Sequence, residues 1–230
     1  MKSEKETDKS SILTKRWYDD ACGAALALEF LGERWSMLIV RELLLGGRRF
    51  SGLRASLPGI SANVLTQRLA GLEQTGVLTK RKLPPPASAQ IYELTPWGYE
   101  AEGPICALSR WAVRSPLHDP SLSLSATALM LSMKTMFVAG RADGVNGAVG
   151  FCIGDDGFVA WVEQGQLVVR RGDPAEAKAV IETAPSALLP VIYGGMPLSQ
   201  AAAATMLSVS GDQALAVRFL GCFALPPKIG

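Results

Sequence analysis

Amide side chains recur at helical spacing in residues 61–73, a stretch that reads SANVLTQRLAGLE. Asn63 and Gln67 are four residues apart, so they point to the same side of a helix, beside Thr66. Side-chain amides can pair with base edges, and they suit adenine best. The opposite side of the helix is apolar and carries Leu65, Leu69 and Leu72. We therefore expect a helix that reads DNA bases, with Ser61 as its N-cap.

Basic residues are concentrated around this helix. Residues 41–82 contain eight Lys and Arg against two acidic residues, a local charge of +6 in a chain whose net charge is +2. Such a field attracts a polyanion. We expect the arginines to reach phosphates and the basic segment 80–82 to reach the backbone or the minor groove. The predicted DNA-contacting residues are Ser61, Asn63, Thr66, Gln67, Arg68, Arg48, Arg49, Lys80, Arg81 and Lys82.

The elements that must position these side chains follow the pattern of a winged helix-turn-helix. A short helix over 52–57 and a tight break at Pro58-Gly59 precede the reading helix. A basic strand over 77–82, a Pro-rich tip and a second strand over 90–94 follow it and form a hairpin.

Three further helices are expected over 17–31, 33–45 and 96–114. The first and the last of them are too apolar for isolated surface helices. We expect these two helices to form the interface of a homodimer.

These motifs give residues 18–114 a resemblance to the HxlR family of winged-helix transcription regulators. The matching segments, in order, are Cys22-Gly23, Leu31–Trp35, Arg49–Leu53, Leu57–Ser61, Leu65–Leu69 and Tyr92–Thr95 followed by Gly98. The resemblance implies a MarR-like fold and a homodimer that places two recognition helices in successive major grooves of an imperfect palindrome. It also implies a redox- or electrophile-sensing cysteine in some members. Cys22 is the candidate here, although Gly23 stands where the family usually has proline.

Length and composition limit the number of domains and the kinds of site that we expect in this chain. The 230 residues exceed the common size of one domain, and 48% of them are hydrophobic, enough for two cores. The four cysteines are not at metal or disulfide spacing, and His118 is the single histidine, so neither a metal site nor a proton relay is expected. The uncharged segment 183–211 is interrupted by Pro and Gly and does not predict a membrane span. We expect a cytoplasmic protein without a cofactor, and not an enzyme.

The second half of the chain predicts an α+β domain. The expected elements are a helix over 122–138, strands over 145–153, 158–163, 167–171 and 177–183, helices over 185–193 and 197–204, a strand over 206–210 and a helix over 212–223. This order places helices on one face of a sheet. The half resembles a sterol carrier protein domain through Phe158–Leu167, Pro185–Leu189 and Ser208–Asp212. That resemblance implies an apolar cavity between sheet and helices, but no particular ligand.

We accordingly divide the chain into a disordered tail over 1–16, a winged-helix domain over 17–117 and a sterol carrier-like domain over 118–230. In the strand before Gly165, alternation turns Trp161 away from the helices, and we expect it to pack against the first domain or against the other subunit. The predicted ligand-binding residues, which can equally fill a solid core, are Met133, Phe137, Phe151, Phe158, Leu188, Ile192, Met206 and Phe219.

The sequence thus predicts a ligand-responsive transcription regulator. It would act as a homodimer on double-stranded DNA, controlled by an apolar small molecule, lipid-like or aromatic, in the second domain. Two alternatives remain open: a thiol-based sensor working through Cys22, and a carrier of hydrophobic ligands. The basic hairpin argues against the carrier. A hydrolase is disfavoured because the second half has no histidine and no nucleophile–base–acid set.

Overall fold

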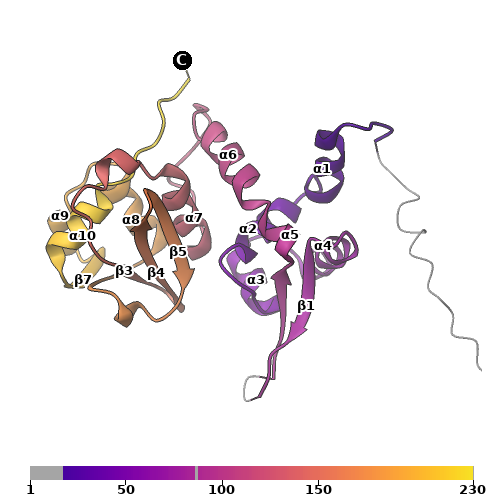
Figure 1. Cartoon of the computed structure of the whole chain (residues 1–230), viewed down its shortest axis with the longest axis horizontal. Coiled ribbons are helices and arrows are strands. Elements are labelled where there is room, and N and C mark those ends of the chain that lie inside the picture. Colours follow the sequence, from indigo (N-terminus) through magenta and orange to yellow (C-terminus); the bar gives the residue numbers. More distant parts are fainter. Residues whose placement is uncertain (1–17, 86–87, 230) are drawn as a thin grey trace, which may run out of the picture.

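Two domains lie side by side in the computed structural model, which describes residues 18–85 and 88–229 (Figure 1). The tail predicted over 1–16, Trp17 and part of the Pro-rich hairpin tip lie outside the described residues. None of the helices within the described ranges has the length and apolar character needed to cross a bilayer.

The first domain is the predicted winged helix-turn-helix. Its elements are α1 (Gly23–Leu31), α2 (Ser36–Leu43), α3 (Phe50–Ser56), α4 (Ala62–Gln74), the antiparallel strands β1 (Leu78–Lys82) and β2 (Gln90–Leu94), α5 (Pro96–Tyr99) and α6 (Glu102–Ala112). The buried side of α4 is the predicted one, because Leu65, Leu69 and Leu72 are at most 2% exposed. They belong to one core with Ile39 of α2 and Leu53 of α3. This packing turns the opposite side of α4 to solvent.

Three of the differences from the expected helix boundaries have a local reason. The first helix begins only at Gly23, because Cys22 is extended, with φ −66° and ψ 135°. The second begins at Ser36, because Trp35 has a left-handed φ of 81°. The helix expected over 96–114 is divided into α5 and α6. Pro104 explains that break, since in a continuous helix its ring would clash with the preceding turn and one backbone hydrogen bond would be lost.

The second domain has the predicted α+β composition. Its elements are α7 (Ala126–Met136), the 3₁₀ turn η2 (Ala139–Arg141), β3 (Val149–Ile153), β4 (Asp156–Glu163), β5 (Gln166–Arg171), the 3₁₀ turn η3 (Pro174–Glu176), β6 (Ala179–Thr183), α8 (Pro185–Ile192), α9 (Leu198–Ala203), β7 (Leu207–Gly211) and α10 (Gln213–Leu220). The strand order is β5-β4-β3-β6-β7. Neighbouring strands are antiparallel except β3 and β6, which are parallel.

Helices cover one face of this sheet. Phe151 of β3, Phe158 of β4 and Ile181 of β6 are completely buried, and Phe219 of α10 packs on Phe151 with ring centroids 6.0 Å apart. The other face is covered in part by η3. A Cβ atom on Gly150 would lie 2.4 Å from a backbone oxygen of η3, so this position needs glycine.

The predicted register of β4 is confirmed, but its predicted consequence is not. Trp161 pairs with Val168 across the turn at Gly165, whose φ is +74°. Trp161 is half-buried on the sheet face opposite the helices. The first domain instead packs against α7, which lies against α2 and α6 and belongs to the helical face. The expectation that Trp161 packs against the first domain of the same chain is therefore wrong, whereas a contact with a second subunit stays a prediction.

Candidate nucleic-acid interface

The outer side of α4 presents polar side chains on a capped helix. Ser61 caps it as predicted, since its Oγ accepts a hydrogen bond from the Val64 N–H at 3.2 Å. Asn63, Thr66 and Gln67 are exposed. Thr66 Oγ1 donates back to a backbone carbonyl of α4 at 2.9 Å. The two amides therefore remain as outward groups that can both donate and accept hydrogen bonds.

Arg68 connects α4 to the start of α2. Its Nη2 lies 2.6 Å from Glu33 Oε2, and its Nε donates to the Arg34 carbonyl oxygen at 3.1 Å. The side chain is 27% exposed, so a contact of Arg68 with phosphate stays a prediction. Arg68 thus positions the helix as well as adding charge.

The basic residues of the hairpin fall into two groups: Lys80 and Arg81 form ion pairs, and Lys82 lies nearer the tip. Lys80 pairs with Glu73 of α4 at 2.7 Å, and this hydrogen bond raises the pKa of Lys80. Arg81 pairs with Glu93 of the neighbouring strand at 2.7 Å. Lys82 is exposed nearer the tip. The ion pairs fix the hairpin beside α4, and Lys82 projects the positive charge beyond it.

Arg48, predicted to contact phosphate, has its side chain paired with the second domain instead. Its backbone exchanges two hydrogen bonds with Tyr92 of β2, at 2.9 and 2.8 Å. Its guanidinium is 14% exposed and donates to Thr127 Oγ1 at 3.2 Å and to Asp156 at 3.3 Å, both in the second domain. Successive residues of an extended segment point to opposite sides. Arg48 therefore points inward and the exposed Arg49 points outward.

A group of charged and polar side chains, called the interdomain cluster below, joins the two domains. Its members are Glu42, Arg48, Ser125, Thr127, Asp156 and Arg171. Glu42 is completely buried and accepts a hydrogen bond from Ser125 Oγ at 2.5 Å. Arg171 donates to Asp156 at 2.5 Å and to Thr127 at 2.6 Å. Burial, followed by the charge of Arg48, lowers the pKa of Arg171.

Sequence reasoning missed this cluster because its members come from distant parts of the chain. One indication was present. Glu42 follows Ile39 by three residues, so helical periodicity puts its carboxylate on the buried side of α2. A buried carboxylate needs partners, and nothing in the sequence shows that the second domain supplies them.

The residues predicted to bind ligand lie in the core of the second domain. Those at most 4% exposed are Met133, Phe151, Phe158, Leu188, Ile192 and Phe219. Phe137 and Met206 are half-buried. Phe219 packs on Phe223 as well as Phe151, with a centroid distance of 5.5 Å to Phe223. Contacts of this kind fill space between sheet and helices, and a ligand cavity among these residues stays a prediction.

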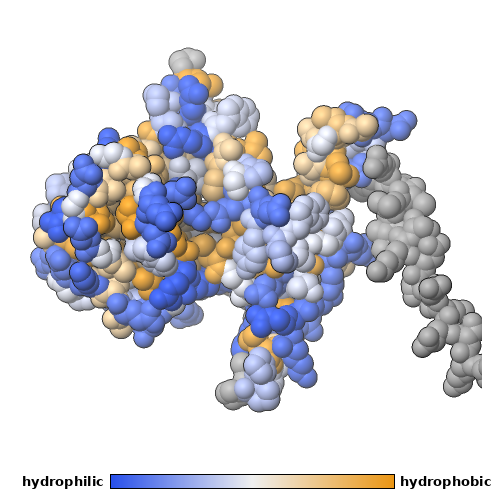
Figure 2. All heavy atoms as spheres, viewed as in Figure 1, coloured by the Kyte–Doolittle hydropathy of each residue, from blue (hydrophilic) through white to orange (hydrophobic). Residues whose placement is uncertain are grey.

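The two helices predicted to form a dimer expose large apolar side chains. They are Leu26 and Leu28 on α1, Leu108 and Trp111 on α6, with Trp97 of the neighbouring α5. Trp111 is 72% exposed. Helix α1 projects from the rest of its domain and shows an apolar surface (Figures 1 and 2). Cys22 is exposed at the start of this helix.

The winged fold, the outward amides of α4 and the basic hairpin define a winged-helix domain of the DNA-binding class. The family model described as HxlR-like helix-turn-helix matches residues 30–118. YvaP of Bacillus subtilis, described as an uncharacterized HTH-type transcriptional regulator, is 41% identical over 87 residues, which are 37% of this chain and 80% of YvaP. YodB of Bacillus subtilis, an HTH-type transcriptional regulator, is 34% identical over 86 residues, 37% of this chain and 77% of YodB. The chain belongs to the HxlR-like helix-turn-helix family.

The match to a solved structure of the reduced form of YodB covers 44% of this chain and 100% of the YodB chain, with 30% identity and a TM-score of 0.39. Residues 123–228 match a family model described as Alkyl sulfatase C-terminal. The second domain is thus similar to that family, and its likeness to sterol carrier proteins stays a prediction.

Proposed function

We propose that this protein is a ligand-responsive transcriptional regulator that binds an imperfect palindromic DNA site as a homodimer. The observation that carries the proposal is the exposed pair Asn63 and Gln67 on α4, together with the exposed Lys82 of the basic hairpin. The amides supply base readout and the lysine supplies phosphate attraction. Membership in a family whose relatives are named transcriptional regulators supports this proposal.

Control by a small molecule needs a connection between the second domain and the DNA-reading elements. The interdomain cluster supplies one, because Arg48 is bonded through its backbone to β2 and through its side chain to Asp156. An effector that favours one arrangement of the domains would change the position of the hairpin. It can shift that equilibrium only by its differential affinity for the two arrangements.

The alternative of a thiol sensor rests on the family resemblance and on the exposed Cys22. The alternative of a hydrophobic-ligand carrier gives no role to the outward amides and to Lys82. The regulator is therefore the function that we put forward for test.

The DNA-reading role of α4 can be tested with Gln67→Ala. We expect this variant to weaken binding to the cognate site by about 1–3 kcal/mol and to relax sequence preference at one position of each half-site. Binding is measured by fluorescence anisotropy against a library of site variants. The matched control is Gln200→Ala, which removes an exposed amide of α9 in the second domain.

Lys82→Ala separates phosphate attraction from base reading. It should weaken all DNA sequences alike and flatten the dependence of affinity on salt. If Gln67→Ala behaved like Gln200→Ala, in affinity and in sequence preference, α4 would not be the reading helix.

A further inference from the structure

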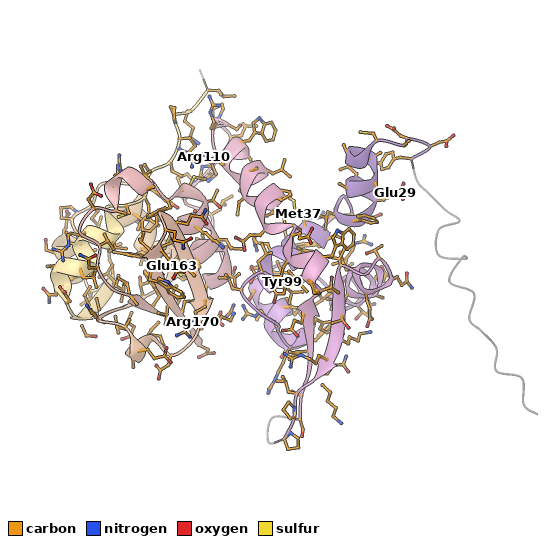
Figure 3. All side chains as sticks on the ribbon, in the orientation of Figure 1. Glu29, Met37, Tyr99, Arg110, Glu163 and Arg170 are labelled. Atoms are coloured by element: carbon orange, nitrogen blue, oxygen red, sulfur yellow. The ribbon has the colours of Figure 1, made fainter. Side chains whose placement is uncertain are left out.

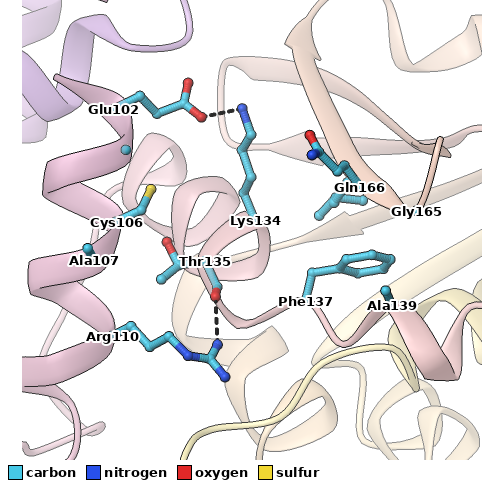
Figure 4. Close-up of a pocket in the computed structure, with 12 residues that line it drawn as sticks. Glu102, Cys106, Ala107, Arg110, Lys134, Thr135, Phe137, Ala139, Gly165 and Gln166 are labelled. Atoms are coloured by element: carbon cyan, nitrogen blue, oxygen red, sulfur yellow. Dashed lines mark hydrogen bonds and ion pairs between the residues drawn. The ribbon is translucent and has the colours of Figure 1, made fainter. Parts of the chain in front are cut away.

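A groove runs between the two domains along α6. Its volume is about 380 Å³, and its walls come from α6 of the first domain, the end of α7 and the β4–β5 turn of the second (Figure 4). Ligand pockets occur preferentially where domains meet, and this volume lies within their usual range. Of the residues predicted from sequence to bind ligand, Phe137 alone lines this groove.

The lining combines an apolar end with positive charge. Phe137, Leu167 and Ala139 form the apolar wall, and the charged side chains of the lining are Glu102, Lys134 and Arg110. Lys134 and Glu102 form an ion pair with each other across the groove, so their charges offset. The remaining charge is that of Arg110, which gives the groove a net positive character.

Arg110 lies on α6, on its side toward the second domain (Figure 3). Its Nη1 donates to the Thr135 carbonyl oxygen at 3.0 Å, in the last turn of α7. A guanidinium has five N–H donors in a planar fork, so Arg110 can donate to a bound anion while it keeps this contact. Its side chain is exposed, so a ligand can reach it from solvent.

Helix α6 offers three different faces. Successive residues of an α-helix are rotated by about 100°. Glu102, Cys106 and Arg110 form one stripe, which lines the groove. Ile105 points into the first domain and is 5% exposed, whereas Leu108 and Trp111 form a third stripe that is exposed. The groove is therefore on a different side of α6 from the apolar surface proposed for dimerisation.

The geometry points to this groove as the effector site, with a small amphipathic monoanion, such as a medium-chain carboxylate, as its ligand. The carboxylate binds Arg110, and the apolar tail lies against Phe137 and Leu167. The ligand contacts α6 and the second domain at once, so its affinity depends on how the two domains are arranged. This inference rests on the proposed function and locates its effector.

Octanoate is the probe, with octanol as the uncharged control. Calorimetry on the full chain should show octanoate binding, with affinity at least ten-fold weaker in Arg110→Gln and unchanged in Arg54→Gln, an exposed arginine of α3. Ala107→Trp should fill the groove and abolish binding, because Ala107 lines it from an exposed position of α6. Octanol should bind the native protein more weakly than octanoate does. The Arg110→Gln variant should bind octanol and octanoate with equal affinity.

Alkylation of Cys106 tests where octanoate binds. Cys106 lines the groove, whereas Cys22 is exposed elsewhere, so octanoate should slow alkylation of Cys106 by N-ethylmaleimide several-fold and leave that of Cys22 unchanged. No binding of octanoate, or binding that Arg110→Gln and Ala107→Trp leave intact, overturns the groove assignment. Those results would leave the DNA-reading test with Gln67→Ala unaffected, so the two proposals can fail separately.

Discussion

His118, the single histidine of the chain, lies in the segment that connects the two domains. The Nζ of Lys228 is 3.4 Å from its Nδ1, and the same ammonium donates to the carbonyl oxygens of Ser115 at 2.9 Å and Val113 at 3.0 Å. Burial, followed by the charge of Lys228, lowers the pKa of His118 from 6.5, while Asp119 acts in the opposite direction. Protonation of His118 therefore opposes this packing.

We expect His118 to titrate below pH 6.5 in the folded protein. The unfolded chain binds this proton more readily, so the contribution of His118 to stability is complete above pH 6.5 and declines as the pH falls through its folded-state pKa. An NMR titration of the ring protons measures this pKa without ambiguity. In Lys228→Met the pKa of His118 should rise only part of the way toward 6.5, because burial is the larger cause of its lowering. A midpoint above 6.5 in the native protein would contradict the prediction.

The roles of single residues could be predicted where one helix decides them. The periodicity of Leu65, Leu69 and Leu72 already determines that Gln67 points outward. Arg48 and Arg49 are indistinguishable by type, and their roles differ because of Thr127 and Asp156. Those partners are 79 and 108 residues away in the sequence, so no local pattern could reveal them.

Helix α2 contributes a completely buried carboxylate to the interdomain cluster. Glu42 lies 2.8 Å from Arg41 Nη2 and 3.6 Å from Arg48 Nη1. Glu42→Gln keeps the shape of the side chain but leaves both arginines without this charge. Removing one partner of a buried ion pair costs about 3–5 kcal/mol, and we expect the lower end of that range because Arg41 is partly exposed. Urea unfolding followed by tryptophan fluorescence measures the loss.

Glu73→Gln is the matched control for this substitution. It removes a carboxylate from an ion pair with Lys80 in which both side chains are at least 35% exposed. Exposed pairs of this kind contribute about 1 kcal/mol or less. Equal losses for Glu42→Gln and Glu73→Gln would show that the interdomain cluster does not stabilise the contact between domains.

The types of the helices and strands were predictable because hydrophobic periodicity distinguishes them locally. The residues at which these helices and strands begin and end were less predictable. The division between α5 and α6 follows from Pro104, whose position was visible in the sequence, whereas the left-handed Trp35 has no local signature. The packing of α7 against α2 and α6 was not predictable, because it depends on surface shape across two domains.

The apolar faces of α1 and α6 predict a homodimer. Leu28→Glu should weaken self-association at least 100-fold, about 3 kcal/mol, because a two-fold interface contains the substitution twice. Sedimentation velocity at micromolar concentration measures it. Leu117→Glu, at a position that is 91% exposed, is the control and should leave the dimer intact. A native protein that sediments as a monomer would rule out this interface.

Because the three faces of α6 differ in character, an insertion in this helix has a larger effect than a substitution. One residue inserted after Ile105 would rotate everything beyond it by about 100°. Trp111 would then turn toward the interior of the first domain, and Arg110 would turn to the side where Trp111 had been. Substitutions on α6 change one neighbour at a time, whereas such an insertion changes all of them together. Substitutions in α6 should therefore be tolerated more readily than insertions or deletions, which change the direction of every later side chain.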